Sequence, residues 1–250
     1  MTPIRDRTAW LQGGDAVCLQ PPLEVKRSWR LVLLGPPGAG KGTLASLLFN
    51  ALGACPLSTG DVFRAAKCHC AAPGTAMATA QAQMTRGELV TDETVLHLLR
   101  ERTRCLHCRG GFMLDGFPRT LAQARALDAL LSEENVLLDA LLNLEMPDDK
   151  LLARLSGRRV CPSCKAVFHV ATQKPRVMGL CDQCGDGLVQ RPDDLPASIR
   201  VRLEAYHSAT MPVADYYRKK GLLVSVAAEG APVDNLAHAL DGLAALGLHE

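Results

Sequence analysis

The feature that most constrains this chain is a nine-residue stretch, GPPGAGKGT, at residues 35–43. It follows a short apolar run at residues 31–34 and precedes a helical pattern that stops at Gly53. In such a turn, glycines let successive backbone N–H groups face a phosphate, and the helix N-terminus adds partial positive charge. The stretch therefore predicts a phosphate-binding loop between a buried strand and a helix.

Within this loop, Lys41 carries a full positive charge that can reach terminal phosphates. Gly42 separates it from Thr43, so the hydroxyl comes one place later than usual. A glycine-rich turn with an incidental lysine is the alternative, and the match of nine residues in the expected context argues against it. The candidate phosphate-binding residues are Gly35, Pro36, Pro37, Gly38, Ala39, Gly40, Lys41, Gly42 and Thr43.

Strand and helix patterns alternate along the rest of the chain. After the strand that ends at Ser58, apolar runs predict strands at residues 112–114, 136–144 and 222–226. Helical patterns occur at residues 94–102, 121–131, 199–220 and 232–246. This alternation predicts an α/β fold with a doubly wound parallel sheet, in which ligands bind at the carboxyl ends of the strands.

Two segments interrupt the alternation and read as inserts in the core. Residues 58–87 are rich in small residues and read as helical, and residues 158–193 are rich in Cys, Gly and Pro. Residues 1–28 read as an irregular N-terminal extension without an assigned function. The predicted core then comprises residues 29–57, 88–157 and 194–250.

Charge and hydropathy exclude several classes of protein. The chain has 28 Lys and Arg against 26 Asp and Glu, a formal charge of +2, which is too small to predict a nucleic-acid partner. No apolar run approaches the ~18 residues of a membrane span, and the N-terminus lacks the pattern of a secretory signal. We therefore expect a cytoplasmic chain, and we expect it to be a monomer.

In a reducing compartment, cysteines are read as thiols or metal ligands before disulfides. Two C-x-x-C pairs, separated by sixteen residues, lie in the second insert. Four thiolates at this spacing fit a closed tetrahedral site for structural Zn²⁺. Two thiol or disulfide pairs without metal are the alternative, and His169 is a rival ligand. The predicted ligands are Cys161, Cys164, Cys181 and Cys184.

A second set of soft ligands consists of Cys68, Cys70, Cys105 and Cys108, with His69 and His107 among them. The Cys105 pair precedes the strand at 112–114 and so lies at its amino end, whereas the other pair follows the carboxyl end of a different strand. We therefore interpret these four as thiols rather than a second metal site.

Charged side chains follow two of the strands at their carboxyl ends. Arg64 lies three residues after Asp61, and Arg119 follows Asp115 in the segment DGFPRT. The two arginines can converge on a second anion, and Gln123 can hydrogen-bond a planar base edge. Asp115 is placed to hold Mg²⁺ through water. This pattern predicts a site for two substrates.

Four further arginines flank the cysteine-rich insert. Arg154 and Arg158 precede it, Arg191 lies at its end, and Arg202 lies on the next helix. Each alone reads as a solvated surface charge. Their position at both ends of one insert instead predicts a lid that closes over polyphosphate with permanently charged donors.

Together these motifs resemble the adenylate kinase family from about residue 30 to the C-terminus. The resemblance rests on GPPGAGKGT, STGDVFRAA, GELVTDE, DGFPRT with the following Gln123, and GRRVCPSCKAVFHV. It implies a P-loop core, an AMP-binding insert and a zinc-bearing lid of the long bacterial type. It also implies reversible in-line phosphoryl transfer, ATP + AMP ⇌ 2 ADP, with Mg²⁺, as in nucleotide biosynthesis.

The resemblance implies a role for each matching residue. ATP would be held by residues 35–43 with Arg154 and Arg158. AMP would be held by Thr59, Arg64, Arg119, Gln123, Arg191 and Arg202. The groups expected to act in catalysis are Lys41, Arg119, Arg158, Arg191 and Arg202. The family also implies a cis peptide bond between Phe117 and Pro118.

Two departures and two alternatives accompany this interpretation. Residues before 29 match nothing in the family, and Ala228-Glu229-Gly230 replaces its usual Asp-Gly. A UMP/CMP kinase typically has Ala at the position of Thr59 and Asn at that of Thr120, so AMP is favoured. A zinc-ribbon binding module with an inactive nucleotide core is disfavoured, because Lys41, Asp115 and the arginines are intact.

Overall fold

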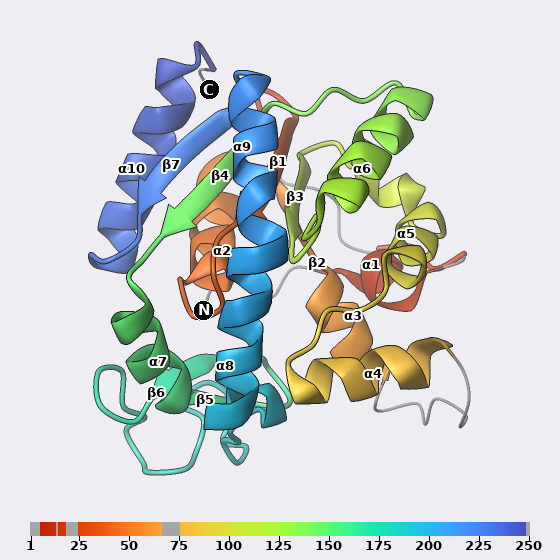
Figure 1. Ribbon diagram of the computed structural model, residues 1–250. Helices are drawn as coiled ribbons and strands as arrows, with labels where there is room; N and C mark the ends of the chain where they lie inside the picture. Colours follow the sequence, from red (N-terminus) through yellow and green to blue (C-terminus); the bar gives the residue numbers. More distant parts are fainter. Residues whose placement is uncertain (1–5, 14, 19–24, 67–75, 249–250) are drawn as a thin grey trace.

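A computed structural model describes residues 6–13, 15–18, 25–66 and 76–248 of the chain. Its described part contains a central sheet of five parallel strands in the order β2-β3-β1-β4-β7. Helices cover both faces of this sheet (Figure 1). The strands are β1 (Trp29–Leu34), β2 (Cys55–Ser58), β3 (Gly111–Asp115), β4 (Ala140–Glu145) and β7 (Leu223–Ala227). The predicted α/β fold with a doubly wound sheet is confirmed.

The central strand β1 shows why the sheet is covered on both sides. Leu31 and Leu33 belong to one buried apolar cluster, and Val32 and Leu34 belong to another. Successive side chains of a strand point to opposite faces, so a continuous apolar run requires a layer of helices on each side. Burying each of these side chains contributes roughly 1.5–3 kcal/mol to folding.

Helices from distant parts of the chain form the two outer layers. The cluster around Leu33 includes buried residues of α2, α7 and α10, and the cluster around Val32 includes residues of α3, α5, α6 and α9. The bounds of these helices are α2 (Lys41–Leu52), α3 (Thr59–Ala66), α5 (Asp92–Arg100), α6 (Leu121–Glu133), α7 (Asp148–Ser156), α9 (Met211–Lys219) and α10 (Pro232–Ala245).

The two predicted inserts lie at the lower end of the molecule in Figure 1. Residues 58–87 include α3 and α4 (Ala76–Arg86), and residues 158–193 include an antiparallel hairpin of β5 (Arg158–Val160) and β6 (Val167–His169). The segment Pro192–Asp194 (η3) forms a short 3₁₀ turn beside α4, after which α8 (Pro196–Ala205) returns to the core. The predicted division into domains stays a prediction.

Several predicted elements have different bounds in the structure. The strand predicted at 136–144 begins only at Ala140, because Val136 packs into the core before the strand and Asp139 accepts a hydrogen bond from the Arg30 N–H. The helix predicted at 199–220 begins at Pro196 and contains a π-helical turn, η4 (Tyr206–Thr210), between α8 and α9. A 3₁₀ segment, η2 (Thr103–His107), precedes β3.

The N-terminal extension is not wholly irregular, which corrects one prediction. Thr8–Gln12 forms a short helix, α1, whose Trp10 side chain is 1% exposed. Five residues do not sustain a helix alone, so this turn depends on the tertiary packing of the indole ring. The helix is too short to show a sequence period, although Ala9 and Leu11 pack against the core beside Trp10.

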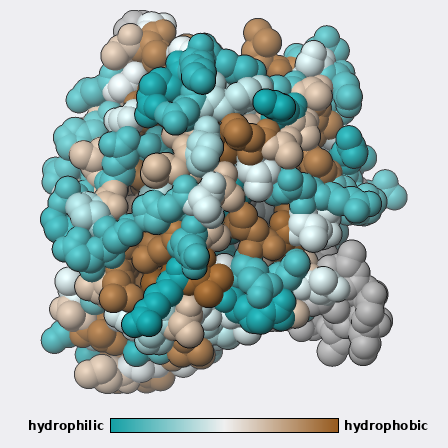
Figure 2. Space-filling model, in the orientation of Figure 1, coloured by the Kyte–Doolittle hydropathy of each residue, from teal (hydrophilic) through white to brown (hydrophobic). Residues whose placement is uncertain are grey.

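The surface in Figure 2 is largely hydrophilic, with smaller groups of hydrophobic side chains between. Among the described residues, no helix is both long enough and apolar enough to cross a membrane.

Candidate active site

The predicted phosphate-binding loop joins β1 to α2, as the sequence indicates. Gly35, Gly38 and Gly40 all have positive φ, at +139°, +88° and +97°. A Cβ atom on Gly35 would lie 2.7 Å from the carbonyl oxygen of Leu144 on β4. The loop lies directly over the carboxyl end of the sheet, and only glycine allows the backbone to come this close to β4.

Lys41 folds over this loop from the first turn of α2. Its Nζ donates hydrogen bonds to the carbonyl oxygens of Gly35, at 2.7 Å, and Pro36, at 2.9 Å. Burial lowers the pKa of Lys41 to about 8, with Arg119, Arg202 and Arg158 acting in the same direction and Asp115 opposing them. The ammonium group is therefore held where the loop glycines and other cations surround it.

Asp115 ends β3 beside the loop and pairs in register with Ser58 of β2 and Leu33 of β1. The Thr59 hydroxyl donates to the Asp115 carbonyl oxygen at 3.4 Å, and Thr59 itself is buried. The neighbouring parallel strands β2 and β3 thus bring Thr59 and Asp115 to the same carboxyl edge of the sheet. The Asp115 carboxylate is a hard oxygen ligand close to Lys41. It therefore suits a Mg²⁺ site whose other ligands include phosphate oxygens.

Arg119 follows Asp115 after a tight bend. Its Nε donates to the Gly116 carbonyl oxygen at 2.8 Å. Burial lowers the pKa of Arg119 to about 10, and Arg202 adds to the effect while Asp115 opposes it. The peptide bond between Phe117 and Pro118 is cis, as predicted.

Gln123 is held rigidly on the first turn of α6. Its Oε1 accepts a hydrogen bond from the Arg119 N–H at 2.7 Å, and its Nε2 donates to Asp92 Oδ1 at 2.6 Å. The Thr120 hydroxyl caps α6 and also donates to Asp92 Oδ2 at 3.1 Å. A cavity beside Gln123 is lined by Thr59, Gly60, Phe63, Met84, Val90, Val95, Gly116, Arg119 and Gln123.

Asp92, in the motif GELVTDE, is a site residue that was not among the predicted ones. It begins α5 and accepts from both Thr120 and Gln123. Asp92 is recognisable only by its hydrogen bonds to Thr120 and Gln123. These bonds form only when α5 and α6 pack together, so the sequence alone does not reveal them.

Arg64 shares the carboxylate of Asp61 with Arg7. Asp61 Oδ1 accepts from Arg64 Nη2 at 2.8 Å, and its Oδ2 accepts from Arg7 Nη1 at 3.1 Å. Burial acts to raise the pKa of Asp61, but the Arg64 and Arg7 guanidinium groups outweigh it and hold that pKa below its usual range. Arg64 lines a second cavity with Gln81, Met84, Thr85, Arg191 and Asp193.

The arginines at the ends of the cysteine-rich insert gather on two aspartates. Arg158 donates two hydrogen bonds to the fully buried Asp194, at 2.7 and 2.6 Å. Arg202 donates to Asp194 Oδ1 at 3.1 Å and forms an ion pair with Asp193 at 3.2 Å. Neither aspartate was predicted, although both directly follow Arg191-Pro192 in the sequence.

These guanidinium groups lower one another's pKa because they are close together and partly buried. Burial lowers the pKa of Arg191 to about 10, with Arg64 and Arg158 contributing. The pKa of Arg202 is also lowered, first by burial, while Asp193 opposes the effect. A polyanion that entered this cluster would relieve the repulsion. The arrangement is therefore suited chemically to binding several phosphates at once.

Arg154 lies apart from this cluster, on the last turn of α7. Its Nη1 donates to the Ala228 carbonyl oxygen, just beyond β7, at 3.2 Å. The neighbouring Lys150 pairs with Glu229. The segment that departs from the family pattern thus lies next to the arginine predicted to contact adenine.

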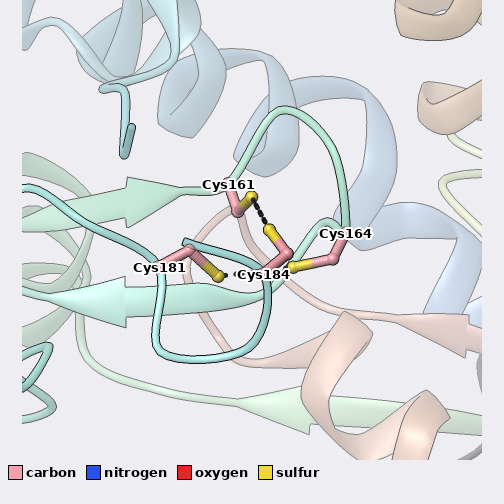
Figure 3. A group of neighbouring side chains, drawn as sticks. All are labelled: Cys161, Cys164, Cys181 and Cys184. Carbon is pink, nitrogen blue, oxygen red and sulfur yellow. Dashed lines mark hydrogen bonds between the residues drawn. The ribbon is translucent and has the colours of Figure 1, made fainter. Parts of the chain in front are cut away.

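The four predicted zinc ligands converge in the cysteine-rich insert, whose β5–β6 hairpin and following loop are called the lid hairpin below (Figure 3). Cys161 and Cys164 lie on the turn between β5 and β6, and Cys181 and Cys184 lie on a second turn farther along the chain. Among the residues described by the structure, Cys161, Cys164, Cys181 and Cys184 are the one group of three or more such donors within 4.8 Å of one another. The closest sulfur pairs are 3.4 Å apart, which excludes a disulfide and approaches the roughly 3.8 Å expected around tetrahedral Zn²⁺. The rival ligand His169 is engaged elsewhere, because its Nε2 donates to the Ala153 carbonyl oxygen at 3.2 Å.

The second cysteine set does not form a metal group within the described part of the chain. Cys105 and Cys108 lie at η2, before β3 and thus at the amino edge of the sheet, as predicted. Burial raises the pKa of Cys105 to about 12. Cys68 and Cys70 lie outside the described residues.

Comparison with known proteins gives one consistent result. The sequence model of the family described as adenylate kinase matches residues 33–222. An adenylate kinase of Streptomyces griseus is 46% identical over 218 residues, which cover 86% of this chain and 98% of the relative. An adenylate kinase of Thermodesulfovibrio yellowstonii is 51% identical over 203 residues, covering 81% and 93%, respectively.

Proposed function

Since this chain belongs to the adenylate kinase family, whose members are phosphotransferases, we propose that it transfers a phosphoryl group reversibly between ATP and AMP, forming two molecules of ADP. The observation that carries the proposal is the gathering of cations around the phosphate loop. Its members are Lys41, Arg119, Arg158, Arg191 and Arg202. Phosphoryl transfer needs positioning and charge stabilisation more than a protein nucleophile, which suits a site built from guanidinium groups.

On the donor side, the amides of residues 35–43 and the Lys41 ammonium group hold the phosphates of ATP. Arg158 adds a charge from the lid, and Arg154 stacks on the adenine beside Ala228. Asp115 would hold Mg²⁺ through water, and the bound ion would neutralise charge that develops on the phosphates. The position of Asp115 between β1 and β2 supports this assignment.

On the acceptor side, Arg64 and Arg119 hold the phosphate of AMP, and Arg191 and Arg202 draw it toward the donor. Thr59 and Gln123 contact its base. The cavity beside Gln123, which Thr59 and Arg119 also line, supports this placement. In-line transfer then needs no covalent enzyme intermediate, and closure of the inserts excludes the water that would otherwise accept the phosphoryl group.

The four lid thiolates hold Zn²⁺ in a purely structural role. Four protein sulfur atoms would fill all four coordination positions of the ion, which would leave no place for a reactive water. The metal substitutes for an apolar core that the hairpin lacks, because its own buried cluster consists of Cys161, Phe168 and Cys181 with three partly buried neighbours. Reduced thiols of this kind support a cytoplasmic location.

A coupled assay of ADP formation tests the proposed function. Purified chain with ATP, AMP and Mg²⁺ should form ADP, and replacing AMP by UMP or CMP should lower kcat/KM strongly. Arg119→Ala should lower kcat by about 10²–10³-fold, because it removes a buried cation from the transferred phosphoryl group. The exposed Arg125→Ala on α6 serves as the control. No ADP from the unaltered chain refutes the proposal.

A further inference from the structure

The short helix α1 lies outside the matched family region, which begins at residue 33. It is nevertheless built into the fold. The Trp10 indole N–H donates to the Ser58 carbonyl oxygen at 2.9 Å, at the end of β2. The Arg102 guanidinium donates to the Trp10 carbonyl oxygen at 2.8 Å and is itself buried. Two hydrogen bonds and a buried ring thus fix α1 against the strand that leads into α3.

This anchorage places Arg7 beside the first turn of α3. Its guanidinium contacts Asp61 Oδ2 at 3.1 Å, while Arg64 contacts the other oxygen, Oδ1, at 2.8 Å. The side chains of all three residues are between 21% and 31% exposed, so water screens these pairs only in part. One carboxylate therefore divides its two oxygens between a cation of the extension and a cation of the acceptor site.

We propose that Arg7 is a positioning residue for the acceptor nucleotide, acting on Arg64 through Asp61. By occupying Oδ2, it prevents Asp61 from taking both N–H groups of Arg64 in a bidentate pair. One face of the Arg64 guanidinium then stays available to the phosphate of the acceptor. Arg7 also offsets the negative charge of Asp61, which would otherwise repel that phosphate.

This inference rests on the proposed function for the identity of the acceptor, AMP. Loss of Arg7 should weaken the acceptor site and leave the donor site unchanged, because nothing in the contact joins Arg7 to the phosphate loop. If Arg7 served only to attach α1, its loss would instead lower the free energy of unfolding or raise KM for both substrates together. The two possibilities differ in their kinetics.

The test compares steady-state kinetics of Arg7→Gln, Arg7→Lys and the control Arg125→Gln in the full chain. Arg7→Gln should raise KM for AMP by about three- to tenfold, with KM for ATP and kcat within twofold. Arg7→Lys, which keeps the charge, should recover most of the loss. In an Asp61→Asn background, Arg7→Gln should add no further change, because the carboxylate that links the two arginines is gone.

Three results overturn the inference: an unchanged KM for AMP in Arg7→Gln, a parallel rise in KM for both nucleotides, or the same rise when Asp61 is already Asn. Calorimetric titration with AMP alone measures the affinity of the acceptor site without catalysis. An unaltered chain that forms no ADP therefore refutes the proposed function only, and equal AMP affinities of that chain and Arg7→Gln refute the role of Arg7.

Discussion

The residues of the site show how strongly a local environment changes a charged group. Lys41 folds over the phosphate loop among three arginines, and its burial there lowers its pKa to about 8. An ordinary lysine is fully protonated at that pH, whereas Lys41 is poised to lose its proton. The same proximity that makes the cluster bind polyanions makes the charge of this residue sensitive to pH.

We predict a pH dependence that follows from Lys41. Its ammonium group is protonated below pH 8 and loses its charge above, so kcat/KM for ATP should fall as pH rises through about 8. Rates of ADP formation at limiting ATP between pH 6.5 and 9.5 measure this. Lys41→Arg should be slower and lack the step, because guanidinium stays charged. A wild-type profile that is flat to pH 9.5 would contradict the assignment.

At the level of elements, the 3₁₀ turn η3 connects the lid hairpin to the core. Its last residue, Asp194, is fully buried and receives Arg158 from β5 and Arg202 from α8. A buried carboxylate with two guanidinium partners fixes the direction of both elements. The sequence predicts both arginines as phosphate ligands but gives no local signal for Asp194, which orients them.

Asp194→Asn should destabilise the fold. The substitution removes the carboxylate that pairs with Arg158 and one of the two carboxylates that pair with Arg202, and we expect a loss of about 2–4 kcal/mol in the free energy of unfolding. Urea denaturation followed by circular dichroism measures it. Asp193→Asn, on a more exposed side chain, should cost clearly less. Equal effects of the two substitutions would show that Asp194 has no special role.

The lid hairpin is the second element whose stability can be tested. Removing Zn²⁺ should lower Tm by at least about 5 °C, because four thiolates lose their common ligand and the hairpin has little apolar core. Calorimetry with and without a strong chelator measures the change. Cys164→Ser should abolish the response to chelator, and the exposed Cys18→Ser should retain it. Unaltered chain without bound metal would rule out the site.

For the whole molecule, the sheet explains both the core and the surface. Its two faces are covered by helices, and its edge strands β2 and β7 are short. Exposed apolar side chains such as Leu121, Leu152 and Val233 belong to different elements of the core. A further group belongs to the cysteine-rich insert and consists of Val167, Val170, Val177, Met178, Leu180 and Val189. Short edge strands do not favour self-association through the sheet.

We therefore predict that the chain is a monomer in solution. Size-exclusion chromatography with light scattering should give the mass of a single chain, 26.8 kDa, at micromolar concentration. The mass should not change when ATP and AMP are added, since closure of the inserts is internal to the chain. A concentration-dependent mass near twice this value would show an interface that these surface features do not indicate.

The sequence by itself determined the phosphate loop, the parallel sheet and the four cysteine ligands. These features are local: glycines at fixed spacing, apolar runs of strand length and C-x-x-C pairs each specify their geometry within a few residues. Only the tertiary structure decided how the charges pair. Asp92, Asp194 and Arg7 meet their partners across elements that are distant in the chain, and the buried Trp10 helps to attach α1. Such pairings depend on which helices pack together, and neither spacing nor composition encodes that.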